Sequence, residues 1–268
     1  VLNNKKISID NIYFVASSNS AGSTLKFGDK EIKVENLENF DFSKVNISFF
    51  SAGKTISEKY VPLAAKHSVV IDNSSFFRMD PDVPLIVPQV NKDHLKNIKK
   101  NIIANPNCST AQLVIVLKSL NDNFKIKRIV ISTYQSTSGA GKKPMDELID
   151  QTKSILNNKS FEVKNFTKQI AFNAIPHIDS FSDDGYTKEE LKMIKETNKI
   201  LGTKIDITAT CVRIPVLVSH AESVNIEFEN DFSIKKVKEL LNTAEGCKVV
   251  DENSDGGYIT PVSYTHLR

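Results

Sequence analysis

The sequence predicts an α/β protein in which a nucleotide-binding unit with a parallel sheet precedes an α+β unit with a mixed, largely antiparallel sheet. In the first part of the chain, short apolar strands alternate with helices, which is typical of a doubly wound sheet. Small-residue loops follow two of these strands, at the end of such a sheet where nucleotides bind. After residue 108 the strands lengthen and alternate polar with apolar residues, which favours antiparallel pairing.

Short apolar runs supply the strands of the first unit. The candidates are residues 12–16, 45–50, 68–71 and 101–104. A hairpin is predicted at Gly28-Asp29, between residues 24–27 and 31–35. A helix is expected over residues 54–66 because four apolar side chains recur there at helical spacing. These are Ile56, Tyr60, Leu63 and Ala64.

Longer elements are expected in the second unit. The candidate helices are residues 109–120, 142–156, 187–201 and 233–241. The candidate strands are residues 127–136, 206–218 and 222–229. The third helix opens on a capping box formed by Thr187 and Glu190 and stops before Gly202. We therefore divide the chain into residues 1–107 and 108–262.

Both ends of the chain interrupt the pattern. A dinucleotide-binding unit should open with a strand and a glycine-rich turn, whereas this chain begins just before what would be the second strand. Residues 263–268 (SYTHLR) continue no pattern and are interpreted as an adapter-derived tail. We therefore expect a polypeptide truncated at both ends.

Composition excludes several classes of function. The net charge is only +3 and the lysines are dispersed, which argues against nucleic acid or a membrane surface as a partner. No apolar run is long enough to span a membrane, and no signal peptide is recognisable. Three cysteines without metal-ligand spacing predict neither a metal site nor a disulfide framework. These features predict a cytoplasmic enzyme with a free thiol.

The strongest local feature is Cys108 in Asn-Pro-Asn-Cys-Ser-Thr, residues 105–110. The turn places Cys108 at the start of an apolar helix, where the helix dipole and unpaired N–H groups favour a thiolate. The same N–H groups suit an oxyanion. A buried structural cysteine is the alternative, but a core cysteine seldom follows Asn-Pro-Asn. We interpret Cys108 as a nucleophile.

A thiol nucleophile needs a proton carrier, and His220 is favoured among five histidines because it follows an apolar strand. Arg213 interrupts the same strand and serves either as an anion clamp or in an internal salt bridge. For Arg78 the same two alternatives, an anion clamp or an internal salt bridge, remain open. Glu189 and Lys192, one helical turn apart, fit an ordinary surface pair. The loop at residues 136–141 (STSGAG) permits close approach of a ligand.

Eight blocks together resemble the aspartate-semialdehyde dehydrogenase family, with the closest likeness to its bacterial, Gram-positive-like branch. They are ASSNSAG (16–22), FSAG (50–53), DNSSFFRMDPDVPLIVPQVN (72–91), NPNCST (105–110), STYQSTSGAG (132–141), IAFNAIPHIDSF (170–181), EELKMIKETNKIL (189–201) and TCVRIPVLVSHAESV (210–224). The resemblance implies an incomplete Rossmann-type NADP-binding domain and a catalytic and dimerisation domain, as in glyceraldehyde-3-phosphate dehydrogenase-like enzymes. It also implies a homodimer or homotetramer.

The resemblance implies reductive dephosphorylation of aspartyl phosphate to aspartate semialdehyde, for lysine, diaminopimelate, threonine, methionine and isoleucine biosynthesis. Cys108 would carry the acyl group as a thioester and His220 would be the acid–base. Gln135 would orient the acyl group, while Arg213 and Glu189 would bind the substrate carboxylate and amino groups.

The remaining implied contacts are to phosphate, substrate and cofactor. Arg78 and Lys192 would hold phosphate, and Asn107 would help to fix the substrate. The nucleotide would contact Ser17, Asn19, Ser20, Ser51, Ser138 and Gly139. The family usually has arginine where this chain has Asn19, so NAD remains open beside NADP. Many relatives have glycine at the position of Ser219.

Three other functions are alternatives to an aspartate-semialdehyde dehydrogenase. N-acetyl-γ-glutamyl-phosphate reductases share the chemistry but typically have glycine before the cysteine and an aromatic residue after it, unlike Asn107 and Ser109. A cysteine hydrolase using Cys108 and His220 would leave Arg213 and the nucleotide-type unit unexplained. An inactive fragment is the third alternative, because the pyrophosphate loop is missing. We expect little activity from this polypeptide and full activity from the full-length product.

Overall fold

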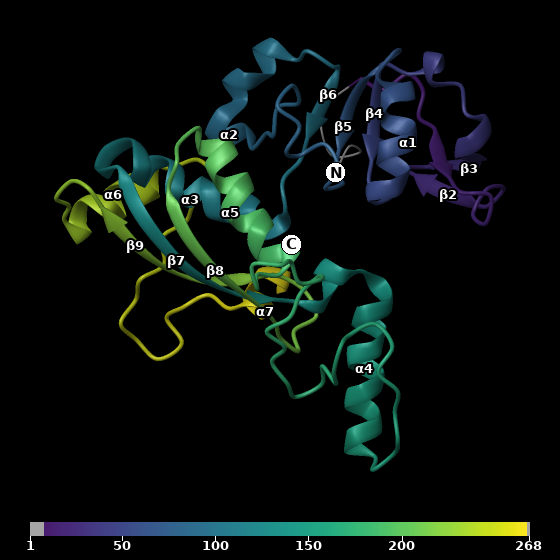
Figure 1. Cartoon of the computed structure of the whole chain (residues 1–268). Coiled ribbons are helices and arrows are strands. Elements are labelled where there is room, and N and C mark those ends of the chain that lie inside the picture. Colours follow the sequence, from purple (N-terminus) through teal and green to yellow (C-terminus); the bar gives the residue numbers. More distant parts are fainter. Residues whose placement is uncertain (1–7, 267–268) are drawn as a thin grey trace.

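The structure is a computed structural model that describes the backbone of residues 8–266 and the side chains as far as Ser263. Figure 1 shows two groups of strands and helices, with α4 extending away from both. Residues 263–266 lie in α7 (Pro261–His266), and the rest of the predicted tail lies outside the described residues. Within residues 8–266, no helix has both the length and the apolar character required to cross a bilayer.

The first sheet contains β1 (Phe14–Ala16), β3 (Lys30–Asn36) and β2 (Thr24–Phe27), in that order. β1 pairs in parallel with β3, and β2 and β3 form the predicted antiparallel hairpin. Gly28 has φ +59° in the turn, which glycine adopts without steric cost.

The second sheet contains β4 (Ile47–Phe50), β5 (Val69–Asp72) and β6 (Ile102–Ala104), all parallel. The helix α1 (Lys54–Ala64) connects β4 to β5 and packs on the sheet. Its buried residues are Ser57, Tyr60, Val61 and Ala64. Leu63, predicted on the buried face, is 45% exposed because it lies outside this i, i+3, i+4, i+7 stripe. The parallel pairs confirm the predicted nucleotide-binding type of fold, divided here between two sheets.

The third sheet has the order β8-β7-β9, formed by β7 (Ile126–Gln135), β8 (Asp206–Arg213) and β9 (Ala221–Phe228). β7 is parallel to β8 and antiparallel to β9, so the predicted mixed sheet is confirmed, with one pair of each kind. β8 ends at Arg213, not at residue 218 as predicted. Pro215 follows, and the carbonyls of Val216 and Leu217 accept instead from Thr137 and Ser138 N–H.

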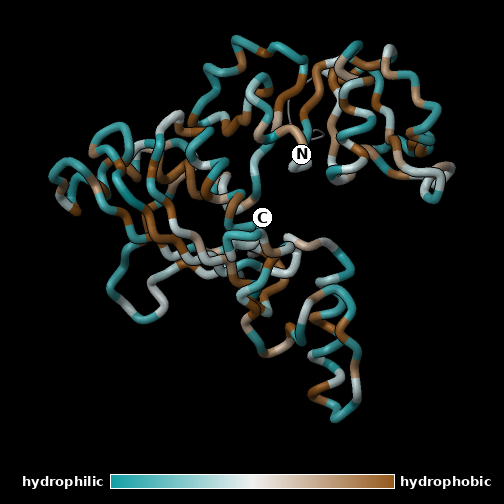
Figure 2. The backbone as a smooth tube through the Cα atoms, in the orientation of Figure 1, coloured by the Kyte–Doolittle hydropathy of each residue, from teal (hydrophilic) through white to brown (hydrophobic). Residues whose placement is uncertain are grey.

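Helices α3 (Cys108–Phe124) and α5 (Lys188–Leu201) pack on each other and on this sheet. Their apolar faces close a core around Leu117, Ile129, Ile131, Met193 and Cys211. Figure 2 shows hydrophobic stretches, coloured brown, along the strands of this sheet. The predicted capping box at Thr187 is present, and Gly202 ends the helix at φ +67°.

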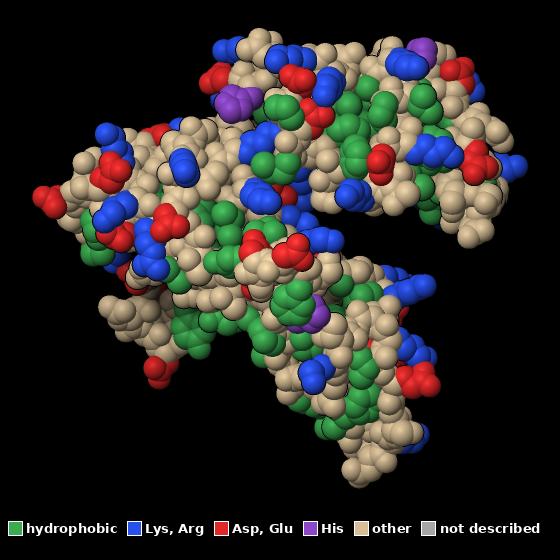
Figure 3. Space-filling view, viewed as in Figure 1, with side chains coloured by type: hydrophobic (Ala, Val, Ile, Leu, Met, Phe, Trp, Pro, Cys, Tyr) green, Lys and Arg blue, Asp and Glu red, His purple; other side chains and the backbone are tan. Residues whose placement is uncertain are grey.

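The remaining helices are short or peripheral. They are α2 (Pro88–Asn91), α4 (Lys142–Leu156), α6 (Ile234–Thr243) and the 3₁₀ segments Leu37–Asn39, Phe42–Lys44, Lys92–Asn97 and Thr137–Ala140. α4 has its own small cluster of Leu148, Ile170, Ala171 and Ile175. On the face shown in Figure 3, basic and acidic side chains are interspersed, as their dispersal in the sequence suggests.

Candidate active site

Cys108 is the first residue of α3, and Asn107 caps this helix. The side-chain oxygen of Asn107 accepts from Ser109 N–H at 2.9 Å and from Thr110 N–H at 3.4 Å. Asn107 is buried, whereas Cys108 keeps an exposed face. The cap therefore fixes the turn that presents the thiol at the helix N-terminus.

His220 approaches Cys108 from the start of β9. Its Nε2 lies 3.2 Å from Sγ of Cys108, within range of a hydrogen bond to sulfur. The residue before it, Ser219, has φ +76°, a left-handed conformation that bends the chain between β8 and β9. This conformation explains why glycine suits the position.

The electrostatic surroundings favour uncharged forms of both groups. Burial raises the pKa of Cys108, the Glu189 carboxylate raises it further, and the Ser109 N–H and Arg213 oppose this less strongly. Burial also lowers the pKa of His220, and the positive charge of Arg213 adds to that effect. The helix N-terminus thus acts on the thiol as predicted, but burial outweighs it. Both shifts favour a thiol beside a neutral imidazole.

Arg213 ends β8 beside this pair and is 6% exposed. Its Nη1 donates to the carbonyl oxygen of Ser136 at 2.6 Å. Among the residues described, no carboxylate lies within ion-pair distance of its guanidinium. The internal salt bridge considered for Arg213 is therefore not formed, and the cation remains available to a ligand.

Gln135 and Glu189 belong to the same site as Cys108, His220 and Arg213. Gln135 is 1% exposed, and its Nε2 donates to Oε1 of Glu189 at 3.3 Å. The same carboxylate oxygen accepts from Asn107 Nδ2 at 2.8 Å. The other oxygen accepts from Lys192 Nζ at 3.2 Å. One carboxylate of α5 thus connects the cysteine turn, β7 and Lys192.

Arg78, in contrast, has an internal partner. Its Nη1 forms a 3.0 Å ion pair with Glu196, and its Nη2 donates to the carbonyl oxygen of Asn73. The second oxygen of Glu196 accepts from Asn107 N–H at 2.7 Å. The salt-bridge alternative for Arg78 is therefore the one that the structure contains. Only its Nε is buried without a partner.

Three residues of this site were not singled out from the sequence: Glu196, Asp179 and Ser136. Glu196 lies two helical turns after Glu189 on the same face of α5, and this spacing was the available signal. Asp179 accepts from Lys192 at 2.8 Å and comes from a loop that no pattern connects with α5. Ser136 opens the small-residue loop before Ser138 and Gly139, and its N–H donates to Nδ1 of His220.

The predicted nucleotide contacts fall in two places. Ser17, Asn19 and Ser20 are exposed in the turn after β1, and Ser51 is exposed after β4. Ser138 and Gly139 lie instead beside the Cys108–His220 pair. A Cβ on Gly139 would come within 3.1 Å of both Arg213 Nη1 and His220 Nε2.

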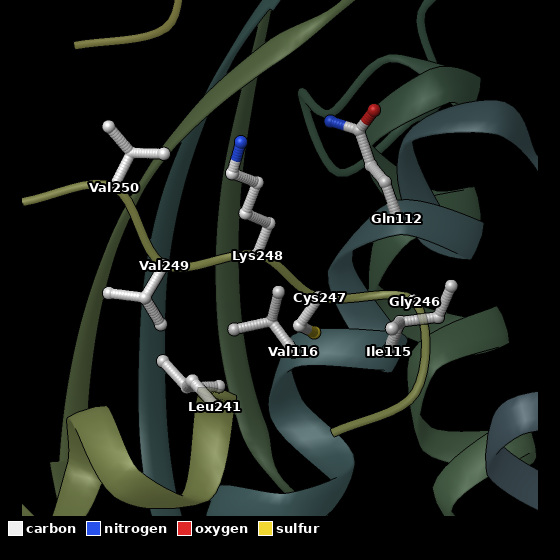
Figure 4. A pocket seen from close by; sticks show the side chains of 9 residues that line it. All are labelled: Gln112, Ile115, Val116, Leu241, Gly246, Cys247, Lys248, Val249 and Val250. Atoms are coloured by element: carbon white, nitrogen blue, oxygen red, sulfur yellow. The ribbon is translucent and has the colours of Figure 1, made fainter. Parts of the chain in front are cut away.

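A hollow of about 460 Å³ lies away from this group, lined by α3, α6 and the segment after α6. Figure 4 shows Gln112, Val116, Leu241 and Cys247 around it. None of the predicted site residues lines it. In the part of the chain that the structure describes, no cluster of His, Cys, Asp or Glu is arranged to hold a metal ion.

Comparison with known families places this fold among the semialdehyde dehydrogenases. The family pattern described as "Semialdehyde dehydrogenase, NAD binding domain" matches residues 1–98, and "Semialdehyde dehydrogenase, dimerisation domain" matches residues 117–267. The chain is 48% identical to the aspartate-semialdehyde dehydrogenase of Rickettsia bellii over 265 residues, which cover 97% of this chain and 78% of that protein. It is 45% identical to that of Helicobacter pylori over 264 residues, covering 94% and 76% of the two chains.

A crystal structure of aspartate semialdehyde dehydrogenase II from Vibrio cholerae superposes with a TM-score of 0.89 at 46% identity, covering 91% of this chain and 74% of that one. The chain belongs to the aspartate-semialdehyde dehydrogenase family. The predicted likeness to a Gram-positive branch is wrong, because these relatives come from Rickettsia, Helicobacter and Vibrio.

Proposed function

We propose that this protein converts L-4-aspartyl phosphate reversibly to L-aspartate 4-semialdehyde and phosphate, with NADP as the redox partner and a thioester on Cys108. The observation that carries the proposal is the 3.2 Å contact between Cys108 Sγ and His220 Nε2 at a helix N-terminus. The Vibrio cholerae relative has also been solved in a complex with ASA, at 46% identity to this chain. The product would serve the biosynthesis of lysine, diaminopimelate, threonine, methionine and isoleucine.

The substrate is held by charges that the site leaves available. Arg213 pairs with the substrate carboxylate through its planar fork, since no protein carboxylate occupies it among the described residues. Glu189 accepts three internal hydrogen bonds, which leaves acceptor capacity for the substrate amino group. Gln135 orients the acyl group from the end of β7, and Asn107 fixes the turn from which sulfur attacks.

The chemistry uses Cys108 and His220 in alternation. His220 removes the thiol proton as sulfur attacks the acyl carbon of aspartyl phosphate, and phosphate leaves with the electrons of the broken C–O bond. NADPH, when bound, supplies the hydride that reduces the thioester. His220 then protonates the oxygen of the reduced carbon and takes this proton back as the carbon–sulfur bond breaks. Aldehyde leaves, and the proton returns to sulfur.

Phosphate is assigned to Lys192 and Arg78. Lys192 has exchangeable partners in Asp179 and Glu189, and its side chain is 25% exposed. Arg78 keeps Glu196 as its counter-ion and offers its unpartnered Nε. Because that ion pair already uses part of the guanidinium, Lys192 is the stronger contributor.

The residues of the first unit fit a nucleotide. Gly53 begins α1 without a side-chain cap, so the first N–H groups of the helix are available to a phosphate at the end of β4. Ser17, Ser20 and Ser51 offer exposed hydroxyl groups at the ends of β1 and β4. Asn19 offers no positive charge to a 2′-phosphate, so NADP would be preferred over NAD less strongly than with arginine there. A Candida albicans relative, 26% identical, is solved with NADP.

The outward face of the third sheet supports a homodimer, with a homotetramer as the alternative assembly. On β8 the outward residues Asp206, Thr208 and Thr210 are exposed, and Tyr134 on β7 is 41% exposed. The family pattern that covers this sheet is a dimerisation domain. A second copy would cover this face, and mass measurement in solution distinguishes dimer from tetramer. The free thiol chemistry suits the cytoplasm.

Purified protein tests the proposal by the nicotinamide absorbance formed from aspartate semialdehyde, NADP and phosphate. We expect a signal that requires phosphate and disappears in Cys108→Ala. A hydrolase would give no nicotinamide signal, and an N-acetyl-γ-glutamyl-phosphate reductase would prefer N-acetylglutamate semialdehyde. Turnover by Cys108→Ala close to the unmodified rate would contradict the thioester.

A further inference from the structure

Ser136 directs all of its polar atoms at the groups of the candidate site. It is fully buried, at 0% exposure, where β7 ends. Its N–H donates to Nδ1 of His220 at 3.0 Å, and its carbonyl oxygen accepts from Nη1 of Arg213 at 2.6 Å. Its hydroxyl lies 3.1 Å from the same Nδ1 and 3.0 Å from the hydroxyl of Ser138.

The two contacts at Nδ1 oppose each other chemically. A main-chain N–H can only donate, so it favours a ring whose Nδ1 is unprotonated and whose single proton is on Nε2. A hydroxyl can donate or accept, so it also suits a ring that has a proton on Nδ1.

Both working forms of His220 have a proton on Nδ1. To remove the thiol proton, Nε2 must present a lone pair to Sγ, which places the ring proton on Nδ1. After the transfer the ring is an imidazolium with protons on both nitrogens. Of the two Ser136 contacts at Nδ1, the hydroxyl is the one that can accept this proton.

We propose that Ser136 is a positioning residue of the acid–base step: its main chain sets His220 beside Arg213, and its hydroxyl accepts the Nδ1 proton in the forms that react. The proposal rests on the proposed role of His220. The hydroxyl of Ser136 then donates onward to Ser138, which is half-buried at the edge of the site. When His220 returns to the other tautomer, the two hydroxyl groups reverse their direction.

The other groups around His220 do not replace this contact. Cys108 of α3 faces Nε2, on the opposite side of the ring. Burial and then Arg213 of β8 lower the pKa of His220, while Glu189 of α5 and, after it, a hydrogen bond to the Ser219 main chain raise it. The 136–140 segment contributes no charged side chain. Without the hydroxyl, a proton on Nδ1 would face a main-chain N–H.

Alkylation of Cys108 by iodoacetamide tests the proposal without substrate or cofactor, so it is independent of whether the dehydrogenase assay succeeds. The rate is followed against pH by mass spectrometry of the Cys108 peptide, with Cys108→Ala as the blank. Thiolate forms near neutral pH only with the imidazolium as its partner. In Ser136→Ala we expect the midpoint of the alkylation profile to move to higher pH by about one unit, and the rate at neutral pH to fall about tenfold.

Thr137→Val is the matched control. Thr137 is also fully buried in the same turn, but its hydroxyl donates to the carbonyl of Val216 and not to His220. This variant should keep the alkylation midpoint of the unmodified protein. An unchanged midpoint in Ser136→Ala, or an equal shift in Thr137→Val, would overturn the proposal. A lower melting temperature in Ser136→Ala without a shifted midpoint would show a purely structural role and would also overturn it.

Discussion

The two buried arginines, Arg213 and Arg78, are almost equally inaccessible, yet they have opposite surroundings. Arg213 is 6% exposed, donates to the neutral carbonyl of Ser136 and forms no ion pair with any described residue. Arg78 is 7% exposed and forms an ion pair with Glu196, whose side chain is 2% exposed. A buried cation without a counter-ion is unfavourable unless something else compensates its charge. We therefore expect an anionic ligand at the end of β8, whereas the charge of Arg78 is largely balanced within the protein by Glu196.

The same difference extends to the neighbours of each arginine. Around Arg78, Lys199 donates to the carbonyl oxygens of Arg78, Asp80 and Val83, so α5 holds the whole segment. Beside Arg213, burial favours the uncharged forms of His220 and Cys108. On β9, Glu222 has a side-chain oxygen that is buried without a hydrogen-bond partner. Satisfied polar groups stabilise a fold, and unsatisfied ones mark a place for a ligand or for proton transfer.

Of the variants that test this comparison, those of Arg213 should have the largest effect on activity. Arg213→Leu removes the proposed carboxylate clamp, and we expect kcat/KM for aspartate semialdehyde to fall at least about 100-fold. Stability should change little, because no protein carboxylate loses its partner. Kinetics and urea unfolding of the same preparation measure both effects. A large loss of stability with intact kcat/KM would reverse the comparison.

Arg78→Met should lower stability more than it lowers activity. It leaves Glu196 buried without its cation, and breaking a buried pair in this way costs about 3–5 kcal/mol of unfolding free energy. Adding Glu196→Gln removes the orphaned charge, so the double variant should be more stable than the sum of the two single losses predicts. Urea unfolding of all four proteins gives the coupling, which should exceed about 1 kcal/mol. Strictly additive losses would show that the pair is not coupled.

Sequence reasoning predicted the elements well because hydrophobic periodicity and capping are local signals. The capping box at Thr187 and the helix start at Cys108 were readable from a few neighbouring residues. The partner of Arg78 could not be predicted from the sequence. Glu196 lies 118 positions away in the chain, and only the packing of α5 brings the two side chains together. The pattern left both alternatives open for each arginine, and tertiary contacts were needed to separate them.

For the same reason, the sequence could not show whether burial or the helix dipole has the larger effect on the pKa of Cys108. The dipole comes from the helix itself, so the sequence gives its direction. The burial of the thiol depends on tertiary packing, as do its contact with His220 and the charges of Arg213 and Glu189 that act on it. Glu189 even opposes the thiolate, and its distance from Cys108 follows from how α5 packs on α3.

Glu222 tests whether the third sheet holds a buried carboxyl without a counter-ion among the described residues. Burial raises the pKa of Glu222 from 4.5 to about 8, against a weaker opposing hydrogen bond from Gln112. The folded-state pKa is raised, so the stabilising contribution of the neutral carboxyl is complete below about pH 4.5 and is lost as pH rises through about 8. Glu222→Gln stays neutral throughout, so its melting temperature should exceed that of the unmodified protein by a few degrees above pH 8.

The melting temperatures of the two proteins should converge as pH falls toward 5, and thermal unfolding across this range measures the difference. A difference independent of pH would mean that Glu222 does not titrate in this way. Glu227, on the same strand but paired with Lys127 at the surface, provides the matched control. Glu227→Gln should give no comparable rise at high pH.

The smallest effect is expected from Gly139, which faces both Arg213 and His220. A Cβ there would lie 3.1 Å from Arg213 Nη1 and from His220 Nε2, so these side chains must yield by a few tenths of an ångström. Gly139→Ala should therefore lower kcat by about threefold to tenfold, because proton transfer and substrate orientation depend on that spacing. Its φ is not left-handed, so unfolding free energy should hardly change. Steady-state kinetics and urea unfolding check this, and a stability loss as large as that of Arg78→Met would show that the end of β8 is packed for stability after all.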